Sequence, residues 1–334
     1  MKKFLKFFSV FLLFTISFLA GCKMPETNDK DEILKKQPYV AVTDSIEQFP
    51  DNASLYLRRA ELLTQNNRHE IAFKDFKKSW ELNPAEQTAF EYASNLSITN
   101  KPDDAIKLLQ DCIAKFPADE EFKRLLSDVY MQNGKSANAL TLFNNIIKSD
   151  SSNADAWYEK GRLLEQMRDT PNAIASLQKA YDFQPTITYT LELANLYAEN
   201  NNAKALQLCN DVISRDSSRE LTDPFFIKGI YYSNTKQYDD AIIQFDSCIR
   251  RDWKLTDAYI EKGIAFFKEK NYDNALNTFR MAASVSFSYP DAYFWIGRCY
   301  EAINKKTEAA EYYQKSIMLD KDFTEAKEAL KRVS

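Results

Sequence analysis

Six glycines occur in this chain of 334 residues, and four of them recur at regular spacing. Gly161, Gly229, Gly263 and Gly297 are separated by 68, 34 and 34 positions. Glycine inside a helix costs about 1 kcal/mol relative to alanine. Its return at one phase therefore indicates a position where a β-carbon would collide with a neighbouring helix. A period of this length predicts a chain built by stacking one structural unit many times.

Other residue types keep the same period. An alanine follows each glycine by twelve positions, and a large aromatic residue precedes each by four. The alanines are Ala173, Ala241, Ala275 and Ala309, and the aromatic residues are Trp157, Phe225, Tyr259 and Tyr293. Four positions after the alanines come Leu177, Phe245, Phe279 and Tyr313. Because residues three or four apart share a helix face, we expect two antiparallel helices per unit, with this last side chain packing onto the first helix.

The earlier part of the chain carries the same frame more loosely. Alanine and a large apolar residue recur at Ala72 and Phe76, and prolines stand at positions 50, 84, 117 and 185. Proline lacks an N–H donor and ends helices, so these prolines mark unit boundaries. The link over residues 215–223 is longer than the others, and either bends the array or forms a longer surface turn.

The series Trp157, Gly161, Leu164, Ala173, Leu177, Ala180 and Pro185 resembles the tetratricopeptide repeat family. The resemblance covers about residues 53–321, in eight units that begin near residues 53, 86, 120, 154, 187, 222, 256 and 290. It implies an all-α fold, a right-handed superhelical solenoid of about eight helix-turn-helix units. Residues 38–52 are expected to form an N-terminal capping helix. Residues 322–334 are amphipathic and predict a C-terminal capping helix, since repeat arrays need polar outer ends.

The first 22 residues have the features of an export signal. Three lysines precede an apolar run over residues 7–19, which ends in Leu19-Ala20-Gly21-Cys22. A positive start, a short apolar stretch and a small-residue exit are typical of a secretory signal peptide over residues 1–21. The last four residues resemble the bacterial lipobox, which implies cleavage before Cys22 and acylation of its thiol. The alternatives are ordinary cleavage that leaves a free cysteine, and an uncleaved anchor.

Residues 22–37 are polar and predict a flexible, lipidated tether. Loss of residues 1–21 removes three lysines and no acidic residue, which moves the formal charge from −4 to −7. This acidic balance disfavours nucleic acid as a partner, so the membrane is expected to be reached through lipid. Lys23 replaces the aspartate associated with inner-membrane retention, which favours the outer membrane and its periplasmic face. The acidic residues that follow resemble surface-export signals, so the cell surface stays the alternative.

Of the other four cysteines, Cys112 and Cys248 are expected to be buried thiols, while Cys209 falls at a large-side-chain position of a second helix and Cys299 within a first helix. Cys112 and Cys248 occupy small-residue positions of second helices, where a thiol acts as a small apolar side chain. Cys209 and Cys248 fall in neighbouring units, so a disulfide between them is the alternative. No pair of cysteines has CxxC or zinc-finger spacing, and no metal or cofactor is expected.

Catalysis has little support in the sequence. His69 is the one histidine, and because it is interpreted as a turn residue, a Ser-His-Asp or Cys-His set would need another histidine, which the sequence does not contain. Its place between two helices predicts a solvated turn residue. Phosphate-binding glycine loops and HExxH or EF-hand spacings are absent from the sequence. We therefore expect a protein that is not an enzyme.

The family resemblance implies that first helices line a concave groove through the second, fifth, ninth and twelfth positions of each unit. In the last three units these positions give an apolar strip with an acidic edge. We expect its partner-binding residues to be Phe226, Ile230, Ile260, Ile264, Phe267, Phe294 and Arg298. A secondary, mixed-charge groove is expected at Arg124, Asp128, Tyr158, Arg162 and Glu165. The alternatives are that the array itself buries part of the apolar strip, and that the charges are only solvated.

These features predict a lipid-anchored adaptor or scaffold in a bacterial envelope complex. Its groove would hold a helix or extended segment of a partner protein. The alternative function is a surface lipoprotein that captures glycan or peptide nutrients directly. The short expected loops and the scattered tryptophans favour the adaptor. The oligomeric state is not predicted.

Overall fold

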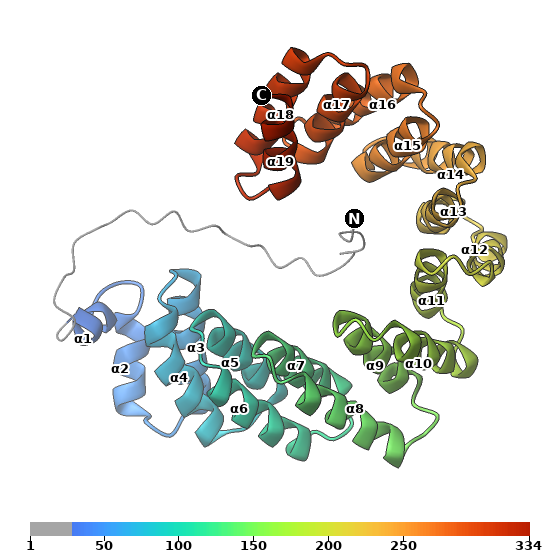
Figure 1. The fold of residues 1–334 in the computed structure, drawn as a ribbon. Helices are drawn as coiled ribbons and strands as arrows, with labels where there is room; N and C mark the ends of the chain where they lie inside the picture. The colour runs from blue at the N-terminus through green and yellow to red at the C-terminus, as the bar shows by residue number, and fades with distance from the viewer. Residues whose placement is uncertain (1–28) are drawn as a thin grey trace. The chain divides into compact units, whose positions relative to one another are not determined.

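The structure is a computed structural model, and it describes residues 29–334. The secondary structure of this part consists of nineteen α-helices (Figure 1). The export signal and Cys22 lie outside the described residues. Residues 29–334 divide into two compact units, one up to Phe122 and one from Lys123 onward. The all-α, helix-pair architecture predicted from the glycine period is confirmed.

The first unit contains six complete helices. They are α1 (Asp29–Leu34), α2 (Val40–Gln48), α3 (Ala53–Gln65), α4 (His69–Leu82), α5 (Glu86–Ile98) and α6 (Pro102–Lys115). Helix α1 lies inside the segment expected to be a flexible tether, so part of that segment is helical. A buried ion pair joins the first helix pair, because the Arg59 guanidinium of α3 donates to both carboxylate oxygens of Asp75 on α4 at 2.6 and 2.7 Å.

Helix α7 (Glu120–Gln132) begins the second series, and most of it lies in the second unit. The following helices are α8 (Ser136–Ser149), α9 (Ala154–Gln166), α10 (Thr170–Phe183), α11 (Ile187–Glu199), α12 (Lys204–Arg215), α13 (Asp223–Asn234), α14 (Tyr238–Arg251), α15 (Thr256–Lys268), α16 (Tyr272–Val285), α17 (Pro290–Ala302), α18 (Lys306–Leu319) and α19 (Thr324–Val333). Every odd-numbered helix from α3 to α17 begins within one residue of the unit start expected from the sequence.

The repeating glycines lie where the two helices of a unit approach most closely. A β-carbon built on Gly263 would come within 2.5 Å of the Phe279 ring, and one on Gly229 within 2.5 Å of the Phe245 ring. Gly161 and Gly297 face Leu177 and Tyr313 in the same way, at 2.6 Å. All four facing side chains are fully buried. The prediction that these residues pack back onto the first helix is therefore confirmed.

The turn between the two helices of each unit uses one residue in the left-handed backbone conformation. The residues are Asn67, Asn100, Gly134, Arg168, Asn201, Lys236, Lys270 and Asn304, with φ between 53° and 68°. The backbone N–H of the following residue closes the turn, as when Arg68 donates to the Leu63 carbonyl at 2.8 Å. This is the αL ending common to helices, in which glycine or asparagine is the usual residue.

The links between units are fixed by a second recurring contact. Where the periodic aromatic residue of the first helix is tyrosine or tryptophan, its side chain donates to a backbone carbonyl six residues earlier. Tyr259 Oη donates to the Trp253 carbonyl at 3.2 Å, and Tyr293 Oη donates to the Phe287 carbonyl at 3.0 Å. Trp157 Nε1 donates in the same way to Ser151 at 2.9 Å. The periodic aromatic residue therefore packs between helices and also holds the preceding link.

Helix α19 covers the end of the array. Its Ala326 and Ala329 are buried against the last helix pair, together with Phe294 and Tyr313. The Arg332 guanidinium of α19 donates to both carboxylate oxygens of Glu301 on α17, at 2.8 and 2.9 Å. These bonds are the largest cause of the lowered pKa of Glu301. The amphipathic C-terminal segment thus packs as a helix on the last unit.

Candidate functional site

The apolar strip expected on the first helices of the last three repeats, α13, α15 and α17, lies partly in the core. Phe226, Ile260 and Phe294 are 8%, 1% and 7% exposed. Phe294 packs on Tyr313 and on Phe323, the residue before the capping helix, with ring centroids 5.8 and 5.1 Å apart. The alternative that the array buries part of the strip therefore holds for these three residues, because neighbouring first helices and the cap close over them.

The rest of the strip is half-buried, and one of its residues, Phe267, lies beside the Arg298 cation. Ile230, Ile264 and Phe267 pack at the edge of core clusters. The Arg298 guanidinium lies 5.6 Å from the ring centroids of both Phe267 and Trp295. Trp295 itself stacks on Phe279 at 5.6 Å. The Arg298 guanidinium also forms an ion pair with the Glu301 carboxylate at 3.7 Å. A guanidinium has five N–H donors, so further donors can bind a carboxylate or carbonyl of a partner. The structure thus brings Phe267 and Arg298 together. It also places Trp295 beside them, which does not stand at one of the groove positions used in the sequence prediction.

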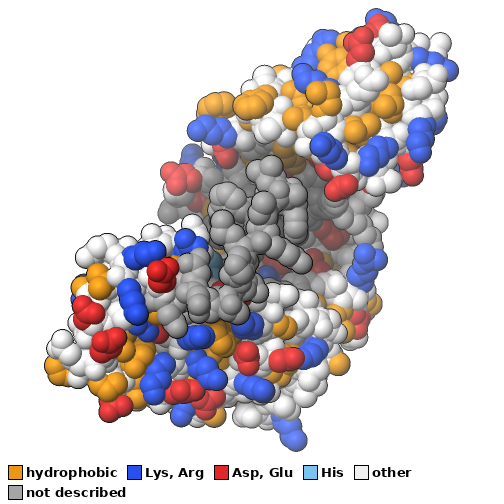
Figure 2. Space-filling model, turned by 90° about the vertical axis from the view of Figure 1, so that its left-hand side faces the viewer, with side chains coloured by type: hydrophobic (Ala, Val, Ile, Leu, Met, Phe, Trp, Pro, Cys, Tyr) orange, Lys and Arg blue, Asp and Glu red, His pale blue; other side chains and the backbone are white. Residues whose placement is uncertain are grey.

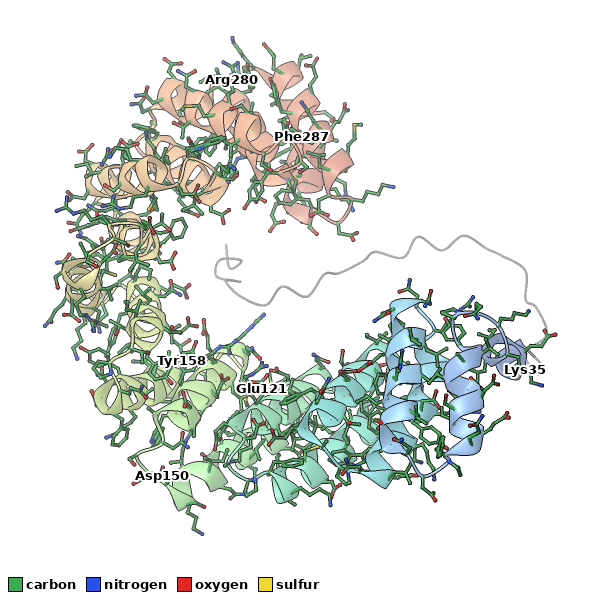
Figure 3. The ribbon with its side chains drawn as sticks, turned by 180° about the vertical axis from the view of Figure 1, so that it is seen from behind. Lys35, Glu121, Asp150, Tyr158, Arg280 and Phe287 are labelled. Atoms are coloured by element: carbon green, nitrogen blue, oxygen red, sulfur yellow. The ribbon has the colours of Figure 1, made fainter. Side chains whose placement is uncertain are left out.

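The predicted mixed-charge groove lies on α7 and α9. Arg124 and Asp128 form an ion pair at 3.1 Å within α7. On α9 the Arg162 guanidinium lies 3.3 Å from the Glu159 carboxylate and 5.8 Å from the Tyr158 ring centroid. Figure 3 marks Tyr158 on α9, and its ring stacks on Tyr189 of α11 at 4.6 Å.

Glu165 lies beside this cluster in an acidic environment. Burial, followed by the negative charges of Glu192 and Glu199, raises its pKa to about 7. Glu159 and Glu192 were missed by sequence reasoning, although they stand 33 residues apart at the same position of successive units. That repeat of an acidic residue was the available signal. Arg162 and Tyr158 thus lie among carboxylates, so the cluster offers both donors and acceptors to a partner.

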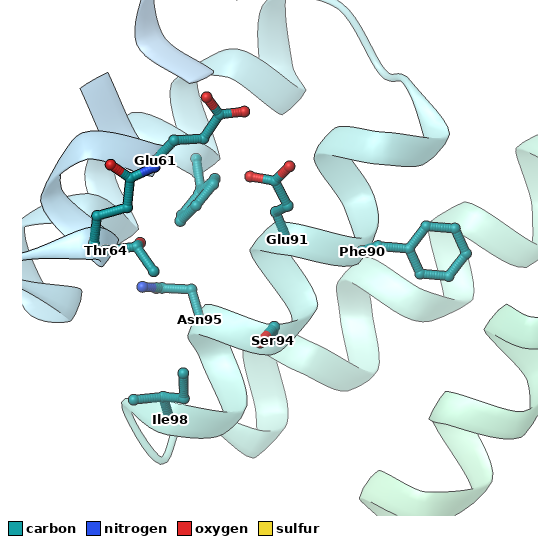
Figure 4. Close-up of a pocket in the computed structure, with 9 residues that line it drawn as sticks. Glu61, Thr64, Phe90, Glu91, Ser94, Asn95 and Ile98 are labelled. Carbon is teal, nitrogen blue, oxygen red and sulfur yellow. The ribbon is translucent and has the colours of Figure 1, made fainter. Parts of the chain in front are cut away.

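A further concave site lies in the first compact unit, the part of the chain up to Phe122, where no functional residue was predicted. Its pocket has a volume of about 520 Å³ (Figure 4). It is lined by Glu61, Thr64, Gln65, Phe76, Phe90, Glu91, Ser94, Asn95 and Ile98, and these residues are called the first-unit pocket below. Glu61 and Thr64 are the ninth and twelfth residues of the repeat that begins at residue 53. Phe90 and Ser94 are the fifth and ninth residues of the repeat that begins at residue 86. The groove positions given above therefore select this pocket when they are read in the first two repeats.

The remaining candidate residues have structural surroundings. Cys112, Cys209, Cys248 and Cys299 are free and buried, so the alternative Cys209–Cys248 disulfide is not formed. Burial raises the pKa of each of these thiols to about 12. His69 is the first residue of α4 and is half-buried with a buried Nδ1 atom, so its expected solvation is wrong. Within residues 29–334 there is no group of three or more His, Cys, Asp or Glu side chains that could hold a metal ion.

The fold defines a helical-repeat protein, and comparison with known proteins gives its family. Tetratricopeptide repeat models match residues 99–146, 124–186 and 290–323. These segments of the chain therefore contain tetratricopeptide repeats. The DnaJ homolog subfamily C member 3 of Gallus gallus is 22% identical over 212 residues. That match covers 59% of this chain and 38% of the relative, so the chain spans well under two thirds of the relative's length.

Solved structures show the same fold at low identity. A tetratricopeptide repeat protein from Parabacteroides merdae has a TM-score of 0.59 at 16% identity, covering 74% of this chain and 98% of that one. PilW, a type IV pilus biogenesis factor, has a TM-score of 0.54 at 16% identity, over 64% of this chain and 97% of its own. A chain of the Cut9–Hcn1 assembly has a TM-score of 0.52 at 17% identity, over 93% of this chain and 61% of that one.

Proposed function

We propose that this protein is a membrane-anchored lipoprotein that acts as a non-catalytic adaptor in a bacterial envelope complex. Its first helices would bind a helix or extended segment of a partner protein. The observation that carries the proposal is the pair of half-buried arginine–aromatic clusters, Arg298 with Trp295 and Arg162 with Tyr158. Arginine, tryptophan and tyrosine are the residues that dominate binding energy at protein interfaces.

The surface charge is compatible with a protein partner. Acidic and basic side chains are interspersed over the faces seen in Figure 2. Mixed signs favour specific pairing with a complementary protein surface, whereas nucleic acid requires a basic stripe. PilW, one of the structural relatives, is described as a type IV pilus biogenesis factor. An envelope assembly of that general kind is the setting we propose for this chain.

Charge reversal at the two clusters tests the adaptor function. The variant Arg162→Glu/Arg298→Glu should lose at least one partner protein that wild type captures by chemical crosslinking in living cells. Lys179→Glu is the matched control, because Lys179 is exposed on the second helix α10. Capture should survive in this control. If the double variant unfolds at the wild-type temperature and captures the same proteins as wild type, the proposed surface is wrong.

The anchor is proposed at Cys22, through the lipobox-like sequence that precedes it. Among residues 29–334, no helix is long and apolar enough to cross a membrane. Stable attachment by lipid requires more than one acyl chain. Cys22→Ser should therefore move the protein from the membrane fraction to the soluble fraction of broken cells. Continued membrane retention of this variant, resistant to high salt, would contradict lipidation at that residue.

Location at the outer membrane, on its periplasmic face, is part of the same proposal. Lys23 beside the anchor supports it by the absence of an inner-membrane retention aspartate. Density-gradient separation of the two membranes should place the wild-type chain with the outer membrane. Protease added to intact cells should leave it uncut, and degradation there would favour surface display instead.

A further inference from the structure

The first-unit pocket has acceptor atoms that no protein group satisfies. Asn95 is 2% exposed, and its Nδ2 donates to the His69 carbonyl at 3.0 Å. That bond fixes the orientation of the amide, so its Oδ1 is the atom left without a partner. The buried Oγ1 of Thr64 also lacks a partner. Buried polar atoms are almost always hydrogen-bonded in folded proteins, so a ligand with donor groups would complete this site.

Two carboxylates add negative charge to the same pocket. The side chains of Glu61, on α3, and Glu91, on α5, point into the same space (Figure 4). Glu91 accepts one long bond, from Gln87 Nε2 at 3.3 Å. No lysine or arginine in residues 29–334 forms an ion pair with either carboxylate. Burial and then the Glu91 carboxylate raise the pKa of Glu61, and Arg58 on the same helix opposes them with a smaller effect. Like charges that share a pocket repel each other, and a cation between them removes the repulsion.

The rest of the lining suits an alkyl stem. Phe76 and Phe90 supply aromatic surface, and the Phe90 ring is held in place by stacking on Phe122 at 4.5 Å. Ile98, which is 53% exposed, also lines the pocket. Long basic side chains bury their methylene groups along apolar surface while their charged ends reach polar partners. Pockets of 300–1,000 Å³ are the usual size for small ligands, so about 520 Å³ accommodates one such side chain and its flanking backbone.

We propose that the first-unit pocket binds a basic side chain, arginine before lysine, from an extended segment of a partner protein. The inference rests on the proposed adaptor function and names one chemical feature of the partner. Arginine is favoured because its planar guanidinium carries five N–H donors. The residues that line the pocket include two carboxylates and the unpartnered Asn95 Oδ1 and Thr64 Oγ1. Lysine offers three donors from a single nitrogen and satisfies fewer of these atoms at once.

Calorimetry with short peptides tests this proposal on the full-length chain purified in mild detergent. The probes are blocked pentapeptides with alanine on both sides of a central arginine, lysine or glutamine. We expect the arginine peptide to bind at least tenfold more tightly than the glutamine peptide, with lysine between them. Binding should weaken as salt rises, because the contact is ionic. Equal affinity of the arginine and glutamine peptides would overturn the proposal.

Variants locate the binding in the pocket. Glu61→Gln/Glu91→Gln keeps the shape of both side chains and removes their charge, and should lower affinity for the arginine peptide at least tenfold. Asn95→Leu, a second variant on the neutral acceptor, should lower it at least threefold. Glu47→Gln is the control, since Glu47 is an exposed carboxylate on α2, and its affinity should stay within twofold of wild type. Unchanged affinity in the double variant would overturn the assignment.

Two further experiments distinguish a protein partner from a free polyamine, and the pocket assignment from the proposed adaptor function. Spermidine carries the same cationic chemistry without a polypeptide, and binding as tight as that of the arginine peptide would overturn a protein partner. Crosslinking in cells separates this inference from the proposed function. If wild type captures partners and the double glutamine variant captures all of them, the pocket assignment fails while the adaptor function stands. If wild type captures no protein, the adaptor function itself fails.

Discussion

Gly263 and Phe279 illustrate how one residue pair sets the spacing of a helix pair. The Phe279 ring occupies the space that a β-carbon on Gly263 would need. Since the same contact recurs with Phe245 and Tyr313, the sequence period was sufficient to predict it. The surroundings of Asn95 were harder to predict, because a single polar residue in a first helix has no sequence mark that distinguishes burial from solvation.

Replacement of Gly263 by alanine should lower the free energy of unfolding by about 1 kcal/mol. Helix propensity would gain about 1 kcal/mol, but overpacking of a close contact costs about 1–3 kcal/mol and also displaces the buried ring. Urea unfolding measures the difference. Phe279→Leu should recover part of the loss in the double variant, because it removes the atoms that collide. A Gly263→Ala variant as stable as wild type would contradict the contact.

Glu165 should make stability depend on pH. Its pKa is raised from 4.5 to about 7 in the folded chain, first by burial and then by Glu192 and Glu199. Between these two values the folded chain holds a proton that the unfolded chain has released. The free energy of unfolding should therefore fall as the pH rises through this range, by about 1 kcal/mol after allowance for solvent screening.

Glu165→Gln should flatten this pH dependence, because the amide does not titrate. Urea unfolding at pH 5.5 and pH 8 measures the slope for both proteins. Glu47→Gln, which changes an exposed carboxylate, should leave the slope as in wild type. An identical slope in wild type and Glu165→Gln would show that Glu165 titrates normally.

At the scale of helices and turns, the start of each first helix was predictable within one residue. The reason is that the glycine, alanine and aromatic positions all report one contact geometry. The turn conformations were harder to predict from the sequence, because Arg168, Lys236 and Lys270 adopt positive φ without the glycine or asparagine that would signal it. Burial of Phe226, Ile260 and Phe294 was also not settled by the sequence. The repeat frame gives the helix face on which a residue lies, but not how closely the next helix covers that face.

Lys270→Gly should raise the free energy of unfolding by about 1 kcal/mol. Lys270 has a φ of 62°, where a β-carbon costs about 1–2 kcal/mol and glycine costs little. Lys268→Gly, two residues earlier at the last residue of α15, should instead lower stability by up to about 1 kcal/mol through lost helix propensity. Thermal unfolding of the two variants should move in opposite directions. A loss of stability in both would contradict the turn assignment.

For the molecule as a whole, repetition divides structural and functional roles between the two helices of a unit. Second helices supply the buried side chains that pack onto the glycines. First helices carry Arg162, Arg298 and most of the first-unit pocket. The links are short, and Phe287, marked in Figure 3, is an exposed apolar residue in one of them. Recognition is therefore expected on first-helix surfaces, in both compact units.

Photo-crosslinking from single positions in living cells tests this division most directly. A photoreactive amino acid is placed at Ser94, Arg162 or Arg298 on first helices, and at Lys74, Lys179 or Asp240 on exposed positions of second helices. The account predicts crosslinks to another protein from the first set and none from the second. Crosslinks from the second-helix positions alone would contradict it.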